Sequence, residues 1–257
     1  MGKIISVVNQ KGGVGKTTSA VNLAAGLGLL GKKVLLIDID PQGNTTSGYG
    51  IDRRNVKVSS YDLLVGDKTV KDAAITTKFK NVTVVPSSMD LAGAEIELID
   101  LHNRNEKLKQ KLLPVRNDYD FILIDCPPSL GLITINALTV SDSVMVPIQC
   151  EYYALEGLSQ LISSVRQVKR IYNPNLEVEG ILLTMYDGRL NLTQQVVGEI
   201  KKYFKDKLYS TVIPRAVRLS EAPSFGEPIQ YYDKHSKGAD AYNNFAKEFL
   251  KKNKGWK

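Results

Sequence analysis

The segment KGGVGKTT at Lys11–Thr18 follows the apolar stretch Ile4–Val8 after two residues, and its glycines and lysines are typical of a phosphate-binding loop. A strand that ends in a glycine-rich turn and opens into a helix directs several backbone N–H groups toward one point. The positive end of the helix dipole points there too, so a polyphosphate can bind. In such a loop we expect Lys16 to reach the β- and γ-phosphates and the Thr17 hydroxyl to ligate Mg²⁺.

This loop departs from the strict pattern G-x-x-x-x-G-K-[ST], because Gln10 stands where the first glycine belongs. Lys11 follows one residue later, so the loop carries two lysines instead of one. A second lysine so near the loop could serve the γ-phosphate of a nucleotide bound by a neighbouring subunit. ATP would then act as a dimerisation switch.

Carboxylates follow two further apolar runs. The sequence VLLIDIDPQGN places Asp38 and Asp40 where a strand gives way to a loop, and FILIDCPPS places Asp125 at the end of another. An acid that ends a buried strand beside a phosphate loop occupies the Walker B position and holds Mg²⁺ directly or through water. Asp125 fits this role, whereas Asp40, in a polar loop with Gln42 and Asn44, is suited to orienting water or sensing the γ-phosphate. The role of Asp38 stays open.

Apolar runs and helical stretches alternate along the chain, which predicts a mostly parallel, twisted sheet with helices on both faces. Several runs are continuous in Val, Ile and Leu, as in parallel strands buried on both faces. Predicted strands are Ile4–Val8, Val34–Ile37, Val82–Val85, Phe121–Ile124, Ser143–Ile148, Ile181–Met185 and Leu208–Ile213. Predicted helices are Thr17–Leu30, Ala92–Leu112, Ile133–Thr139, Leu155–Ile171, Leu192–Phe204 and Gly238–Lys252. We expect Gly31 to stop the first helix.

The net charge of +7 is unevenly distributed over the 257 residues. Residues 1–200 hold 21 Lys/Arg and 21 Asp/Glu, whereas residues 201–257 hold 13 Lys/Arg and 6 Asp/Glu. A one-sided basic region suggests a polyanionic partner, although a solvated lysine-rich surface would have the same composition. We expect a single domain over residues 1–257, without a signal peptide or a membrane-spanning segment, in the cytoplasm. There Cys126 and Cys150 would be buried, reduced thiols.

Together these motifs resemble the deviant-Walker P-loop ATPases of the ParA/MinD superfamily, and most closely its Soj/ParA partition branch. The resemblance covers essentially the whole chain. Besides the three motifs above, it is carried by QCEYYALEGL (Gln149–Leu158), LLTMYDGRLNL (Leu182–Leu192) and VIPRAVRLSEAPSFG (Val212–Gly226).

The resemblance implies a dimer that encloses two ATP molecules with Mg²⁺. Lys11 would reach the partner's nucleotide, Asp40 would be needed for hydrolysis, and Glu151 would contact ribose across the interface. Pro214 and Arg215 would pack against adenine. The remaining phosphate-loop residues would bind the nucleotide of their own subunit: Gly12, Gly13, Val14, Gly15, Lys16, Thr17 and Thr18.

The resemblance also implies function beyond hydrolysis. The ATP dimer of this family binds DNA without sequence preference and releases it after hydrolysis, which a ParB-like centromere-binding protein stimulates. Arg189 and Arg218 match basic positions implicated in DNA contact, which would associate the protein with the nucleoid. A secondary role in replication-initiation control stays open. Helical lysines either extend this patch or form a solvated face: Lys201, Lys202, Lys205, Lys247, Lys251 and Lys252.

Two alternatives remain. A membrane-cycling ATPase of the MinD type would use the stretch from Phe245 to Trp256 as an interfacial helix, instead of packing Phe245 and Phe249 on the core. An iron–sulfur reductase like the nitrogenase iron protein would bridge a cluster with two cysteines per subunit at the dimer axis. Cys126 directly follows the proposed Mg²⁺ ligand and Cys150 ends a predicted core strand. We therefore expect neither cysteine on a surface shared by two subunits.

Overall fold

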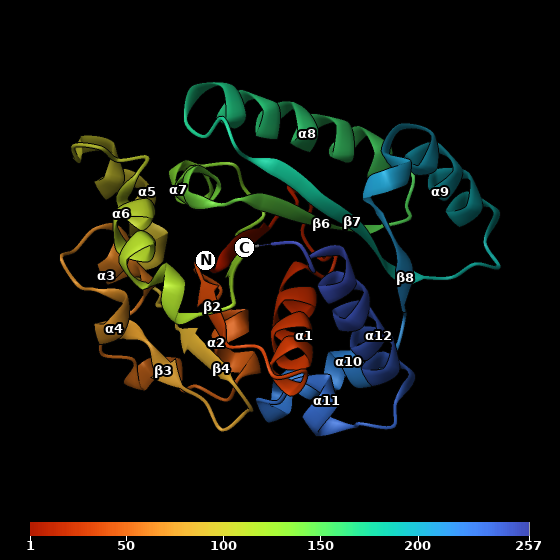
Figure 1. Cartoon of the computed structure of the whole chain (residues 1–257), viewed down its shortest axis with the longest axis horizontal. Helices are drawn as coiled ribbons and strands as arrows, with labels where there is room; N and C mark the ends of the chain where they lie inside the picture. The colour runs from red at the N-terminus through yellow and green to blue at the C-terminus, as the bar shows by residue number, and fades with distance from the viewer. Residues whose placement is uncertain (257) are drawn as a thin grey trace.

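The computed structural model describes residues 1–256, and within them eight strands form one sheet in the order β3-β4-β2-β5-β1-β6-β7-β8 (Figure 1). Neighbouring strands run parallel, apart from the antiparallel pair β3 and β4. The predicted mostly parallel sheet is therefore confirmed. The strands are β1 (Lys3–Val7), β2 (Val34–Asp38), β3 (Ile75–Thr76), β4 (Val82–Val85), β5 (Phe121–Asp125), β6 (Ser143–Gln149), β7 (Glu177–Tyr186) and β8 (Leu208–Pro214).

Helices cover both faces of this sheet, as the sequence predicts (Figure 1). The longer helices are α1 (Lys16–Leu29), α5 (Leu91–Glu97), α6 (Lys107–Leu112), α7 (Leu132–Val140), α8 (Ala154–Ile171), α9 (Asn191–Phe204) and α12 (Lys237–Lys252). Short helices are α2 (Asn44–Gly48), α3 (Ser60–Leu64), α4 (Val70–Ala73), α10 (Val217–Glu221) and α11 (Ile229–Tyr232). Short 3₁₀ segments are η1 (Arg53–Asn55), η2 (Leu98–Asp100), η3 (Leu113–Asp118), η4 (Lys205–Lys207) and η5 (Ala222–Phe225).

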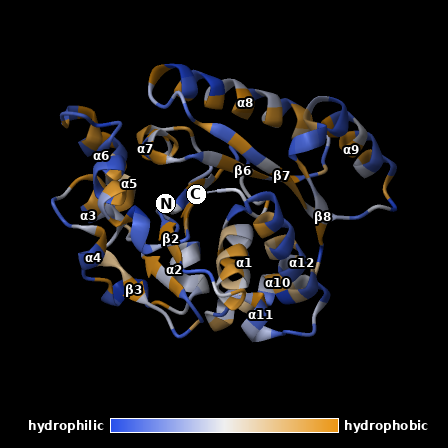
Figure 2. Cartoon of the chain, viewed as in Figure 1, coloured by the Kyte–Doolittle hydropathy of each residue, from blue (hydrophilic) through white to orange (hydrophobic). Residues whose placement is uncertain are grey.

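Two hydrophobic cores lie on opposite faces of the sheet. Successive residues of β1 point to different cores: Ile4 packs with residues of α5 to α9, and Ile5 packs with residues of α1 and α12. Because both faces are buried, the central strands are apolar without alternation. In Figure 2 apolar residues occur on the strands and as bands along the helices that cover them, among them α1 and α8.

One helix prediction was wrong. The structure has no continuous helix over residues 92–112 within its described part, because α5 ends at Glu97 and α6 begins only at Lys107. Between them Asn103 adopts a left-handed backbone conformation, with φ of 54°, which an α-helix cannot continue through. The first helix ends as predicted, with Gly31 at φ of 84° two residues after Leu29.

The last helix packs on the core. Phe245 and Phe249 are fully buried against the α1 side of the sheet, so the interpretation of this helix as an interfacial membrane element is wrong for both side chains. No helix formed by residues 1–256 combines the length and the apolar character that crossing a membrane requires. Both cysteines are free and buried, as expected, and burial raises the pKa of each thiol, that of Cys150 to about 11.

Candidate nucleotide site

Three strand ends that are far apart in the sequence meet at the carboxyl edge of the sheet. The strand order places β2, β5 and β1 side by side, and Asp125 pairs in register with Asp38 on one side and with Val7 on the other. The loops that leave these strands carry the glycine-rich segment, the Asp40 loop and Asp125. In open parallel sheets this edge is where ligands bind.

The phosphate-binding loop follows β1 and passes directly into α1. Gly13 and Gly15 have φ of 75° and 83°, in the left-handed region that favours glycine, so the loop can turn tightly before the helix begins. Lys16 is the first residue of α1, and its ammonium donates to the Lys11 carbonyl at 3.1 Å. Burial lowers the pKa of Lys16, although Asp125 and Asp40 oppose this shift. Thr17 and Thr18 complete the first turn.

A side chain of β7 and a main-chain carbonyl of β6 hold this loop from the other side. The Thr184 hydroxyl donates to the Val14 carbonyl at 2.8 Å. Asn9 donates to the Pro147 carbonyl at 2.8 Å and accepts from the Lys11 N–H at 3.0 Å. Neither Asn9 nor Thr184 was expected at the site, because their contacts with Pro147 and Val14 join segments that are far apart in the sequence.

Asp125 lies fully buried at the end of β5. Its Oδ2 accepts from the Thr45 hydroxyl at 2.8 Å, whereas its buried Oδ1 has no hydrogen-bond partner among residues 1–256. Burial raises the pKa of Asp125, and the hydroxyls of Thr17 and Thr45 oppose that shift. A buried carboxylate oxygen without a partner, beside the Thr17 hydroxyl, is the donor set that Mg²⁺ prefers. The residues therefore fit a magnesium ion.

Asp38 has a structural role that the sequence left open. Its carboxylate accepts from the Thr46 N–H at 2.8 Å, from the Thr46 hydroxyl at 2.6 Å and from the Asp40 N–H at 3.2 Å. Burial and then the charge of Asp125 raise the pKa of Asp38. These bonds fix the loop that carries Asp40. Asp40 is itself buried, and its carboxylate accepts from the Gln42 N–H at 2.9 Å.

Lys11 and Glu151 lie together on the exposed side of the loop. Their side chains form an ion pair within the same chain, with 45% and 43% of each side chain exposed. Next to Lys11, a Cβ on Gly12 would meet no described atom within 4 Å apart from those of its two sequence neighbours. This side of the loop therefore faces open space, and its two charged groups are only weakly held by one another.

Pro214 and Arg215 lie apart from the loop, at the end of β8. Three strand spacings of about 4.8 Å separate β8 from β1, so the distance is about 14 Å. Pro214 pairs in register with Tyr186 at the end of β7. The preceding residue, Met185, has φ of 48°, which is uncommon outside glycine and asparagine and is found at ligand sites. The sequence analysis did not single out Met185.

Arg189 and Arg218 lie outside the nucleotide site and are exposed. Arg189, between β7 and α9, makes a two-pronged ion pair with Asp187 at 2.7 and 2.9 Å. That pairing lowers the pKa of Asp187 to about 2. Arg218 in α10 pairs with Glu221 at 2.8 Å and lies 3.5 Å from Asp233. The arginine positions are thus accessible, although each is already paired with a carboxylate.

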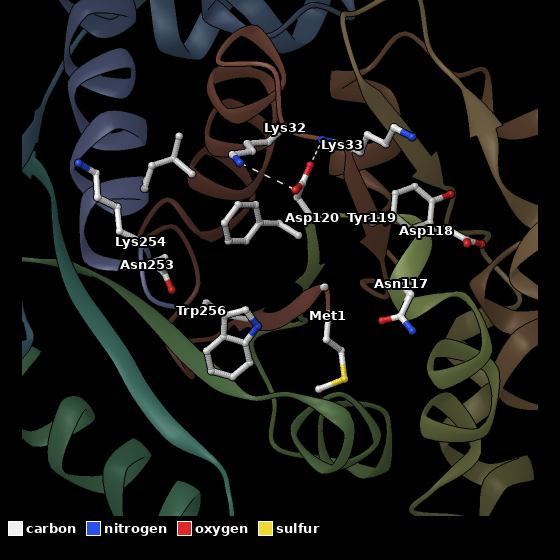
Figure 3. Close-up of a pocket in the computed structure, with 13 residues that line it drawn as sticks. Met1, Lys32, Lys33, Asn117, Asp118, Tyr119, Asp120, Asn253, Lys254 and Trp256 are labelled. Atoms are coloured by element: carbon white, nitrogen blue, oxygen red, sulfur yellow. Dashed lines mark hydrogen bonds and ion pairs between the residues drawn. The ribbon is translucent and has the colours of Figure 1, made fainter.

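A cavity of about 780 Å³ lies at the opposite edge of the sheet (Figure 3). It is lined by the segments that precede β1, β2 and β5 and by the end of the chain, including Met1 and Trp256. Three lysines and two aspartates are among the residues that line it, and Asp120 accepts from the Lys33 N–H at 2.8 Å. Because the nucleotide loop leaves the other ends of these strands, this cavity is not part of the candidate site.

The chain is similar over most of its length to several known proteins. The family model described as "AAA domain" matches residues 2–178. The sporulation initiation inhibitor protein Soj of Bacillus subtilis is 60% identical over 248 residues, which cover 96% of this chain and 98% of that protein. The chromosome partitioning protein ParA of Myxococcus xanthus is 50% identical over 252 residues, which cover 98% of this chain and 89% of that protein.

A solved structure gives the same fold with a nucleotide in place. It is described as cobyrinic acid a,c-diamide synthase from Mycobacterium smegmatis, with a bound ATP analogue and magnesium. That protein is 36% identical, the match covers 100% of this chain and 98% of that one, and the TM-score is 0.86.

Proposed function

Because the chain belongs to the Soj/ParA family of chromosome-partitioning ATPases, we propose that its ATP-bound form is a dimer that binds DNA without sequence preference. The chain is an ATP-hydrolysing enzyme that uses ATP and Mg²⁺. Hydrolysis, stimulated by a ParB-like partner, would release the DNA and so move or position an origin region or plasmid. The observation that carries this proposal is the exposed Lys11 beside the open, glycine-lined side of the phosphate loop.

Within one subunit, the backbone N–H groups from Gly12 to Thr18 would bind the phosphates, with Lys16 at the β- and γ-phosphates. Thr17 and the free Oδ1 of Asp125 would hold Mg²⁺, which supplies charge neutralisation to the phosphates. Pro214 and Arg215 would contact the adenine ring, and Met185 lies on the neighbouring strand end.

Asp40 would place the attacking water. Its main chain is fixed by three contacts, in which Asp38 accepts from its N–H, Ser87 donates to its carbonyl at 2.6 Å, and Gly43 donates there at 2.9 Å. With its main chain fixed and its carboxylate bonded to the Gln42 N–H at 2.9 Å, Asp40 can orient a water molecule without moving itself. Phosphoryl transfer to water depends mainly on such positioning and on charge neutralisation.

On dimerisation, Lys11 and Glu151 would give up their mutual ion pair and contact the partner's nucleotide instead. An ion pair whose partners are nearly half exposed contributes only about 0–1 kcal/mol, so leaving it costs little. Lys11 would then approach the γ-phosphate of the partner's nucleotide, and Glu151 its ribose. Two DNA-binding surfaces on one rigid dimer bind far more tightly than either alone. Nucleotide state would thereby set DNA affinity.

The direct test is DNA retention with ATP, with ADP and without nucleotide, each in the presence and absence of a ParB-like protein. The proposal expects retention with ATP and Mg²⁺ only, and faster release when the partner is added. Equal retention in all nucleotide states would contradict it. Parallel sedimentation with anionic vesicles distinguishes the MinD-type alternative, for which vesicles would be retained in place of DNA.

A further inference from the structure

A second buried hydroxyl contacts the proposed metal ligand. Thr45, the second residue of α2, is fully buried and donates from its Oγ1 to Asp125 Oδ2 at 2.8 Å. Thr45 is not in the glycine-rich loop and is not a charged residue, so it carries no chemistry of its own. Its only side-chain hydrogen bond among the described residues ends on Asp125.

This bond determines how the Asp125 carboxylate is presented. With Oδ2 engaged by Thr45, the other oxygen is the one that remains without a partner in the described chain. A carboxylate at the end of a strand can rotate about its terminal torsion, which has a broad energy minimum. A hydrogen bond to one oxygen restricts that rotation and keeps the other oxygen available to a cation.

The next residue on the same helical turn holds the Asp40 loop. Thr46 donates to Asp38 through its N–H and its hydroxyl, and its Oγ1 accepts from the Ser87 N–H at 2.9 Å. Ser87 in turn donates to the Asp40 carbonyl at 2.6 Å. One turn of α2 therefore connects the proposed metal ligand with the proposed water-positioning residue, entirely through buried groups.

We propose that Thr45 is a positioning residue for ATP hydrolysis. Its hydroxyl orients the Asp125 carboxylate toward Mg²⁺, and its place in α2 fixes the distance between Asp125 and the Asp40 loop. This inference rests on the proposed role of Asp125 as a magnesium ligand. Thr45 itself touches neither nucleotide nor metal in this account. It acts through Asp125.

The experiment compares Thr45→Val, which keeps the side-chain shape, with Thr45→Ser, which keeps the hydroxyl. Affinity for a fluorescent ATP analogue is measured over a magnesium titration, and kcat and KM for ATP are measured alongside. Loss of an outer hydrogen bond to a metal ligand typically costs 10–100-fold in metal affinity or activity. We expect Thr45→Val to raise the half-saturating Mg²⁺ concentration and lower kcat by about that factor, with nucleotide affinity in saturating Mg²⁺ little changed. Thr45→Ser should restore both.

Two controls make the result decisive. Thr139→Val removes another buried hydroxyl, whose only hydrogen bond among residues 1–256 is to the Ile135 carbonyl of α7, and should leave the magnesium titration unchanged. Asp125→Asn tests the premise: an unchanged magnesium requirement in that variant contradicts the proposed metal site itself. If Asp125→Asn shifts the titration and Thr45→Val does not, the role of Thr45 alone is overturned. Failure of Thr45→Ser to restore the titration also overturns it, since the hydroxyl would then not be the active group.

Discussion

At the level of single residues, the proposed hydrolysis mechanism depends most on Asp40. The Asp40→Ala variant should bind nucleotide and dimerise normally, because Asp38 and Ser87 hold the loop through its main chain and not through its carboxylate. Turnover should fall about 100-fold or more, as for the loss of a group that handles the attacking water. On the same sample, phosphate release measures turnover and light scattering measures dimerisation.

Asp67→Ala is the matched control, since Asp67 is exposed in a loop before α4 and should tolerate the change with full activity. Normal turnover in Asp40→Ala would remove this carboxylate from the mechanism. Loss of nucleotide binding would instead show that the loop depends on the side chain.

The residues that the sequence could predict are those within local motifs. Lys16 and Thr17 follow from the glycine-rich segment, and Asp125 from its place after an apolar strand. Asn9, Thr45 and Thr184 could not be predicted, because each acts through a contact between segments that are far apart in the chain. A threonine or asparagine has no local signal that distinguishes such a contact from an ordinary solvent-exposed hydrogen bond.

At the scale of elements, a buried polar network joins β1, β7 and the end of α12. Lys3 donates to Glu179 and to Asn253, whose amide donates to Glu179 at 2.7 Å. Burial alone would raise the pKa of Glu179, but Lys3 and the hydrogen bonds from Ser143 and Asn253 outweigh it and hold this pKa below 4.5. The stabilisation of the fold by the ionised Glu179 carboxylate is therefore fully present above the pKa that this group has in the unfolded chain. It is lost as pH falls through the lower pKa of the folded state.

Glu179→Gln should accordingly destabilise the fold by about 3 kcal/mol at pH 7, because it leaves the Lys3 ammonium buried without its charge partner. Urea unfolding at several pH values measures this. The difference from the wild-type protein should persist down to pH 4.5 and shrink below it. Glu199→Gln, in an exposed pair with Lys202, should change stability by under about 1 kcal/mol. A loss that did not vary with pH would contradict the ionic explanation.

Long elements were predicted well, and short or interrupted ones were not. The central strands and α1, α8, α9 and α12 follow from composition and periodicity over many residues. Helices such as α2 and α3, with five residues each, are too short to show a helical period. The break after α5 was missed because apolar residues resume at helical spacing on both sides of the polar run 102–107, and the left-handed backbone of Asn103 lies in that run.

At the scale of the whole molecule, DNA binding should depend on Arg189 and Arg218 together with the ATP-bound dimer. We expect Arg189→Glu or Arg218→Glu to abolish DNA retention without changing nucleotide affinity. Binding through phosphates alone falls by about 0.9 log units per log unit of salt for each contact. Retention over a salt series therefore measures the number of contacts.

Lys71→Glu is the control for a change of charge, because Lys71 is exposed in α4 within the balanced part of the sequence. It should leave retention almost unchanged. Full DNA binding in both arginine variants would place the DNA-binding surface elsewhere, and the excess of lysines in residues 201–257 would be the next candidate.

In the proposed dimer, two copies of the chain contact one another through the open side of the phosphate loop. A Cβ at position 12 would meet no described atom of its own chain within 4 Å apart from its two sequence neighbours, so Gly12→Val should fold and retain nucleotide affinity. It should fail to dimerise, because the added side chain fills the space into which the second copy must come. Gly198→Val in α9 meets equally open surroundings and should behave as the wild-type protein does.

Molar mass by light scattering in Mg²⁺ and a non-hydrolysable ATP analogue shows whether bound ATP holds two copies together. We expect twice the monomer mass for the wild-type protein and for Gly198→Val. For Gly12→Val we expect the monomer mass, with the analogue still bound. A wild-type protein that is saturated with the analogue and remains a monomer would contradict the proposed dimer.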